Sequence, residues 1–79
     1  MNRFTELKDN EVALLRAEHS TGIVLDEMFN RAVKDNQNVY TVFKSEKEAV
    51  AAARKMLLDK DNIEIVIYGS KEECLHYLT

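Results

Sequence analysis

A helix-start signal between two strand-like segments constrains the fold of this chain more than any other feature. Ser45 and Glu48 form an S-x-x-E capping box, in which each side chain satisfies a free backbone N–H of the other residue. The segments on either side, VYTVF (39–43) and IEIVIY (63–68), are rich in β-branched and aromatic residues. The sequence therefore predicts a strand, a helix and a second strand in that order.

The predicted helix covers residues 45–58 and has one apolar side. Its run of alanines allows a close approach to a sheet, and the polar tetrad 59–62 supplies turn-forming residues at its end. A crossover of about twenty residues is long enough for the two strands to run parallel in a right-handed βαβ unit. The apolar stripe follows helical spacing and consists of Ala49, Val50, Ala53, Met56 and Leu57.

The strand at 63–68 has two unlike faces. Its three isoleucines alternate with other residues and make one face fully apolar. The other face is mixed, and we expect it to meet solvent or a partner. The apolar face holds Ile63, Ile65 and Ile67, and the mixed face holds Glu64, Val66 and Tyr68.

A second helix is predicted at about residues 23–35, because five apolar residues repeat there at helical spacing. Its start stays open, since Ser20 or Thr21 can cap a helix, whereas residues 22–24 also fit a turn that leads into a strand. A polar loop at 35–38 ends it. The repeating residues are Leu25, Met28, Phe29, Ala32 and Val33.

Residues 11–19 (EVALLRAEH) allow two interpretations. They fit a strand that is buried on both faces, or a helix that places Leu7, Leu14 and Leu15 on one side. We favour the strand, because a sheet of two strands is only marginally stable and a third strand makes an independent core.

The tail at 70–79 also stays open between two structures. Ser70 and Glu73 form a second S-x-x-E match, which favours a short helix. A hairpin loop at 69–72 followed by an edge strand at 73–78 fits equally well.

Together these elements predict one α+β domain spanning residues 1–79. We expect a small two-layer sandwich, in which a sheet of three or four strands is covered on one face by the helices at 23–35 and 45–58. The first ten residues form a lead-in that is anchored by Phe4. A second domain is excluded by the length of 79 residues.

Charge and composition exclude several classes of partner. Eleven basic and fourteen acidic side chains give a net charge of −3, which argues against nucleic-acid binding through a basic field. No apolar run is long enough to cross a membrane, and the first ten residues lack the apolar core of a signal peptide. Cys74 is the single cysteine, which fits a reducing compartment. We therefore expect a cytoplasmic protein.

No motif for catalysis, metal or cofactor appears. His19 and His76 are the two histidines, and neither has a second ligand at metal-binding spacing. The stretch 59–61 lacks the closing glutamate of a calcium loop, and Gly22 and Gly69 are too isolated for a phosphate-binding loop. The sequence thus predicts a non-enzymatic protein with no catalytic residues, no metal and no cofactor.

A helical interpretation of residues 11–19 has a further consequence. Residues 11–36 then become two helices joined by a short turn, as in a helix-turn-helix. Asp26 and Glu27 would occupy the first turn of the second helix, where a DNA-reading helix carries basic or amide side chains. This argues against DNA binding.

Two functions of different classes remain. The first is a protein-interaction module that associates through a face or an edge of its sheet, most often with itself as a homodimer. The second is a small-molecule or metabolite-sensing domain with a pocket between sheet and helices. Tyrosine is favoured at interfaces, so an uncovered sheet face lined by Tyr40, Tyr68 and Tyr77 would support the first.

Overall fold

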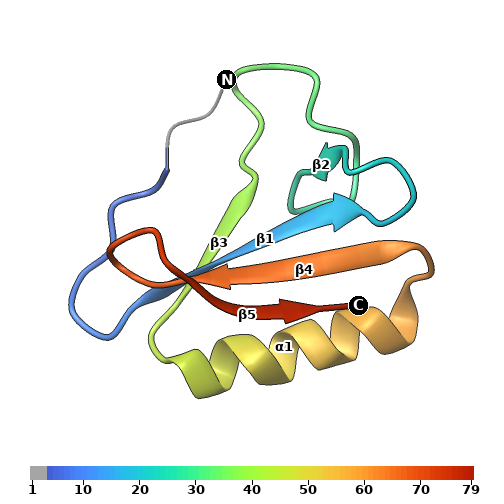
Figure 1. The fold of residues 1–79 in the computed structure, drawn as a ribbon. Helices are drawn as coiled ribbons and strands as arrows, with labels where there is room; N and C mark the ends of the chain where they lie inside the picture. Colours follow the sequence, from blue (N-terminus) through green and yellow to red (C-terminus); the bar gives the residue numbers. More distant parts are fainter. Residues whose placement is uncertain (1–3) are drawn as a thin grey trace.

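Strand β1 (Val12–Glu18) is the centre of the sheet (Figure 1). Along one of its edges it pairs with β4 (Ile63–Tyr68) over almost its whole length. Its other edge is divided between β2 (Val24–Leu25) and β3 (Tyr40–Phe43). Strand β5 (Cys74–Leu78) pairs with the free side of β4, and every pairing is antiparallel.

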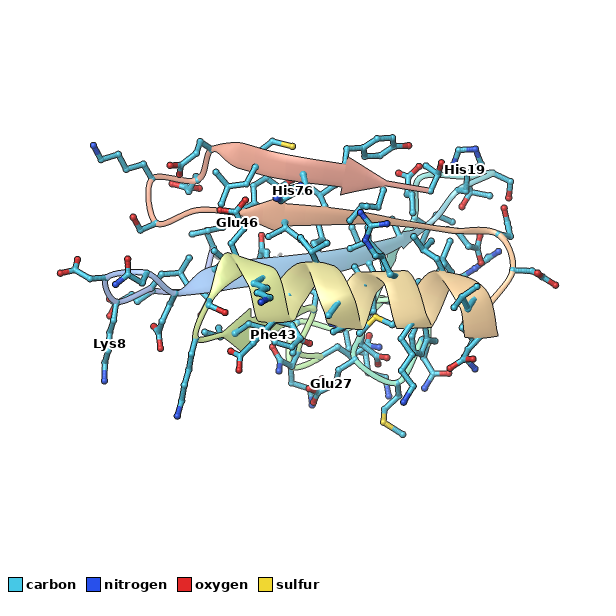
Figure 2. The ribbon with its side chains drawn as sticks, turned by 90° about the horizontal axis from the view of Figure 1, so that it is seen from below. Lys8, His19, Glu27, Phe43, Glu46 and His76 are labelled. Carbon is cyan, nitrogen blue, oxygen red and sulfur yellow. The ribbon has the colours of Figure 1, made fainter. Side chains whose placement is uncertain are left out.

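This computed structural model describes residues 4–79 and contains one α-helix in that range, α1 (Glu46–Asp59), which lies across one face of the sheet (Figures 1 and 2). The backbone N–H of Glu48 donates to the Ser45 hydroxyl at 3.2 Å, so Ser45 caps the helix as predicted. The two glutamates of the first turn, Glu46 and Glu48, lie where the helix dipole favours negative charge. The helix ends before the turn at 60–62.

The two strands that flank α1 run in the same direction, as predicted, but they are not neighbours. β3 and β4 are each antiparallel to β1, and β1 lies between them. An element from the N-terminal half of the chain therefore completes the strand-helix-strand unit. This insertion puts Leu14 of β1 beside Ile67 of β4.

The core lies between α1 and the sheet. Leu14, Ile65 and Ile67 have no exposed surface, and neither have Ala49 and Ala53 on the facing side of the helix. Small residues on α1 let the helix approach the sheet closely, while the large side chains come from the strands. The alternation predicted for residues 63–68 is confirmed, since the three isoleucines are buried and their neighbours are half-buried.

The sheet has five strands instead of the expected three or four. The strand interpretation of residues 11–19 is confirmed by β1, and the edge-strand interpretation of the tail by β5. A bulge shifts the register of β5 between its pairs with Ile67 and Tyr68, so that Leu75 as well as Leu78 packs against the core.

The helix predicted at 23–35 is wrong, and with it the prediction of two helices on one face. The segment forms β2, an isolated bridge between Leu25 and Arg31, and an irregular loop. Of its five repeating apolar residues, Met28 and Val33 are 74% and 79% exposed, and Phe29 has a φ of 64°, which no α-helix accommodates. The helix-turn-helix alternative for residues 11–36 is wrong for the same reason.

The one helix of residues 4–79, α1, is not long and apolar enough to span a lipid bilayer.

Candidate functional site

The sheet face opposite α1 has no helix over it in the described chain (Figure 2). The residues of β1 on this face are Ala13, Leu15 and Ala17, because they alternate with the buried Leu14. Two tyrosines pair with these β1 residues: Tyr68 with Ala13 and Tyr40 with Leu15. The third, Tyr77 of β5, pairs with Val66 of β4 on the same face. The three tyrosines therefore lie on the uncovered face, each in a cross-strand pair.

Phe4 covers part of this face. Its ring contacts Tyr40 and Tyr68 edge-to-face, at centroid distances of 5.3 and 5.8 Å. Such contacts add to the apolar burial of the rings. The predicted anchoring role of Phe4 is confirmed, and the outer parts of the face, at Val42 and Tyr77, remain 42% and 55% exposed.

The two histidines lie on opposite faces of the sheet. His76 of β5 turns toward α1, where its Nε2 lies 2.5 Å from a carboxylate oxygen of Glu46 (Figure 2). His19 follows β1, and its Nδ1 lies 3.1 Å from Oε1 of Glu64 on the uncovered face. The Tyr77 hydroxyl donates to the same oxygen at 2.9 Å, which raises the pKa of Tyr77. The structure therefore does not bring the two histidines together.

Cys74 is exposed at the start of β5, and its thiol donates to the backbone oxygen of His76 at 3.6 Å. Within residues 4–79 no three His, Cys, Asp or Glu side chains are arranged to hold a metal ion. Both carboxylate–histidine pairs lie at the surface. The Tyr77 hydroxyl is hydrogen-bonded to Glu64 of one pair, and no hydroxyl or thiol contacts the side chains of the Glu46–His76 pair in the described contacts.

The predicted polar loop at 35–38 is confirmed, but it is the end of a longer loop at 26–38, whose first part the sequence predicted as a helix (Figure 1). Its ends meet where the N–H of Glu27 donates to the oxygen of Asn38 at 3.1 Å. A loop of this length with joined ends has the form of an Ω-loop, a class that frequently carries function.

Asp26 organises the first half of this loop. One carboxylate oxygen accepts the N–H groups of Met28 and Asn30, at 2.9 and 3.0 Å, and the other accepts the side-chain amide of Gln37 at 2.8 Å. These hydrogen bonds, the one from Gln37 first, lower the pKa of the Asp26 carboxyl.

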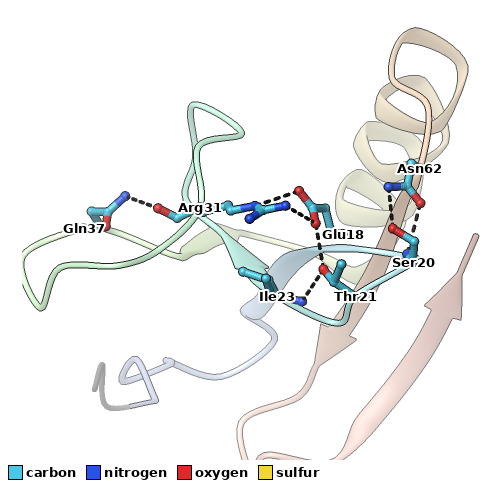
Figure 3. Close-up of polar contacts among 7 residues, drawn as sticks. All are labelled: Glu18, Ser20, Thr21, Ile23, Arg31, Gln37 and Asn62. Atoms are coloured by element: carbon cyan, nitrogen blue, oxygen red, sulfur yellow. Dashed lines mark hydrogen bonds and ion pairs between the residues drawn. The ribbon is translucent and has the colours of Figure 1, made fainter.

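Gln37 organises the second half. Its amide oxygen accepts the N–H groups of Val33 and Lys34, both at 2.7 Å. Its amide nitrogen donates to the Arg31 oxygen at 2.9 Å, as Figure 3 shows. The Arg31 guanidinium in turn binds both carboxylate oxygens of Glu18 at 3.0 Å, which ties the loop to β1. The loop is therefore ordered by side-chain hydrogen bonds to backbone.

Strain is built into the same loop. Phe29 adopts a left-handed backbone conformation, which costs a bulky residue of the order of 1–3 kcal/mol. Its ring packs against the core, and the Lys60 ammonium lies 5.0 Å from the ring centroid. These contacts hold the loop in place from the helix side of the sheet.

Arg16 is the most unusual buried residue, with 1% of its surface exposed. Its guanidinium donates to the Thr41 hydroxyl at 2.8 and 2.9 Å and to the Val39 oxygen at 3.1 Å, while its buried Nε has no partner. Burial lowers the pKa of Arg16, and the carboxylates of Glu27 and Asp26 partly offset that effect. The sequence contained one signal for this buried charge: an arginine inside VALLRAE, a strand predicted to be buried on both faces.

An apolar cavity of about 520 Å³ lies on the uncovered side, between β1 and the second half of the 26–38 loop. Between the sheet and α1, Leu14 and the three buried isoleucines pack in the core. The cavity is lined by Leu15, Val24, Ala32, Val33, Lys34, Asp35, Val39 and Tyr40.

Comparisons of this chain with models of protein families, with curated proteins and with solved structures found no match. The strand pairings and the single helix of residues 4–79 define a small α+β fold with an antiparallel sheet.

Proposed function

We propose that this chain is a non-enzymatic protein-interaction module of the cytoplasm whose partner is a second copy of itself, bound along the free edge of β5. The observation that carries the proposal is the composition of this edge. β5 pairs with β4 on one side only, and no other strand of residues 4–79 covers its outer side. Its five residues, CLHYL, include no Lys, Arg, Asp, Glu or Pro.

The two edges of the sheet differ in how well they are protected against pairing with a strand of another chain. The edge opposite β5 is divided between a two-residue strand, β2, and a four-residue strand, β3. Short, interrupted edge strands are a common protection against unwanted pairing, as are charged residues and prolines. β5 is longer than either and lacks those residues; its bulge at Leu75 leaves the regular register at His76 to Leu78 intact.

An antiparallel pairing of two β5 strands about a two-fold axis gives hydrogen-bond partners to the backbone groups on the outer edge of both copies. With the axis at Tyr77, His76 faces the partner's Leu78 within the regular part of β5, and no like-charged Lys, Arg, Asp or Glu side chains oppose each other within the paired strands. The same surface is used on both sides, so the assembly closes as a dimer and does not grow into a fibre.

Light scattering on a sizing column, over a range from low to high micromolar, tests the proposal. The expected mass at high concentration is about 18 kDa, twice the chain mass of 9.1 kDa. The variant Tyr77→Lys places a charge on β5 at a residue that is 55% exposed, at the cost of the hydrogen bond from Tyr77 to Glu64, and it should return the mass to that of one chain.

Val42→Lys is the matched control. Val42 is 42% exposed and lies on the same sheet face, at the opposite edge in β3. It should leave the dimer intact. A constant mass of one chain in the unmodified protein contradicts self-association, and a dimer broken by Val42→Lys but not by Tyr77→Lys would move the interface away from β5.

A further inference from the structure

The cavity beside the 26–38 loop has the size and lining of a small-molecule site. Its volume of about 520 Å³ falls within the range of about 300–1,000 Å³ typical of ligand pockets. Leu15, Val24 and Tyr40 of the strands form one wall, and Ala32 and Val33 of the loop form the other. Most of this lining is aliphatic, which suits a flexible hydrocarbon chain better than a polar metabolite.

The loop wall is fixed before any ligand arrives. The backbone of Val33 and Lys34 is held by the Gln37 amide, and Gln37 is held by Asp26. A preformed wall reduces the ordering cost that a ligand would otherwise meet on binding.

One ammonium group in the cavity lining is available to bind an anion. Lys34 belongs to the lining, and its ammonium has no acidic partner within 4.0 Å among residues 4–79. The lining also contains the carboxylate of Asp35, which takes part in a further interaction. The buried Arg16 guanidinium lies 3.1 Å from the backbone oxygen of Val39, and the carboxylates of Glu27 and Asp26 offset its charge.

We infer that this cavity binds an aliphatic carboxylate of the medium-chain fatty acid class, with the hydrocarbon between β1 and the loop and the carboxylate at Lys34. The ammonium supplies a charge-assisted hydrogen bond to the carboxylate, and the aliphatic lining removes the chain from water. This inference is independent of the β5 interface, which lies at the other edge of the sheet.

Decanoate below its micelle concentration is the probe, titrated into isotope-labelled protein while amide chemical shifts are followed by NMR. Shifts are expected at Leu15, Val24 and Ala32, with saturation in the millimolar range or below. Lys34→Glu should weaken decanoate binding about tenfold or more and leave the binding of decanol, which has no charge, unchanged. Lys34 is exposed, so this variant is expected to fold.

Two further variants make the outcome decisive. Lys55→Glu carries the same charge change on the exposed part of α1 and should bind decanoate like the unmodified protein. Ala32→Phe fills the cavity and should abolish the binding of both decanoate and decanol. The inference is overturned if decanoate does not saturate these shifts, if Lys34→Glu binds it equally well, or if Ala32→Phe leaves the binding of both probes unchanged.

Discussion

The helix-covered side of the sheet and the loop at 26–38 are held together by different forces. Between α1 and the sheet, Leu14, Ile65 and Ile67 exclude water completely. In the loop, Met28 and Val33 are mostly exposed, and Asp26 and Gln37 bind backbone N–H groups instead. A small chain can therefore order one region by burial and another by local hydrogen bonds, and an apolar period in the sequence, which both regions carry, does not distinguish them.

The largest expected difference in stability between the two faces of the sheet is between alanine substitutions at the neighbouring residues Leu14 and Leu15. Leu14→Ala empties a fully buried site and should lower the free energy of unfolding by about 2–5 kcal/mol. Leu15→Ala, on the uncovered face, removes the same atoms from a half-buried site and should cost about 1–2 kcal/mol.

Urea unfolding of both variants at low micromolar concentration measures the two losses. An equal loss at both positions would contradict the distinction between a packed face and an open one.

A smaller loss of stability, with its main structural effect in the loop, is expected from Gln37→Ala. Loss of the amide leaves the N–H groups of Val33 and Lys34 without their acceptor and frees one oxygen of Asp26. Stability should fall by about 1–2 kcal/mol, and amide exchange at Val33 and Lys34 should become much faster.

The neighbouring Asn36→Ala changes an exposed amide of similar chemistry and serves as the control. Exchange rates in β1 and β4 should rise in Gln37→Ala only by the factor of about 5–30 that a loss of 1–2 kcal/mol allows, and should not change in Asn36→Ala. An equal acceleration in the loop and in the sheet would contradict a role of Gln37 that is centred on the loop.

The smallest expected effect is a response of the loop to acid. Because hydrogen bonds lower the folded-state pKa of Asp26, its contribution to stability is fully present above the ordinary aspartate pKa of about 3.9. That contribution is lost as the pH falls through the lowered pKa of the folded state.

Amide shifts of Met28 and Asn30, followed from about pH 6 to about pH 2, should titrate with a midpoint below the ordinary value. Asp26→Asn should remove the transition at both amides. A midpoint at or above 3.9 would mean that the carboxylate is not held as described.

Sequence reasoning succeeded where local signals and burial agree. The cap at Ser45, the helix after it, the alternation of residues 63–68 and the strand at 11–19 all follow from spacing and residue type, and the structure confirms them. The open choice for the tail was resolved toward β5, because β4 offers its free edge only in the folded sheet.

The predicted helix at 23–35 failed because an apolar period carries no information about competing hydrogen bonds. Asp26 captures the backbone N–H groups of Met28 and Asn30, and such side-chain contacts are the ones that compete with helical hydrogen bonds. Gln37, eleven residues from Asp26, completes the arrangement, and nothing in the local pattern links the two.

The sequence by itself determined the strand-helix-strand unit, because a capping box and an apolar period act within a few residues of one another. Only the tertiary structure decided that β1 lies between β3 and β4, that Arg16 is buried, and that one face of the sheet stays open beside the 26–38 loop. These features depend on pairings between residues far apart in the chain, whose free energies are set by packing and desolvation in the folded state.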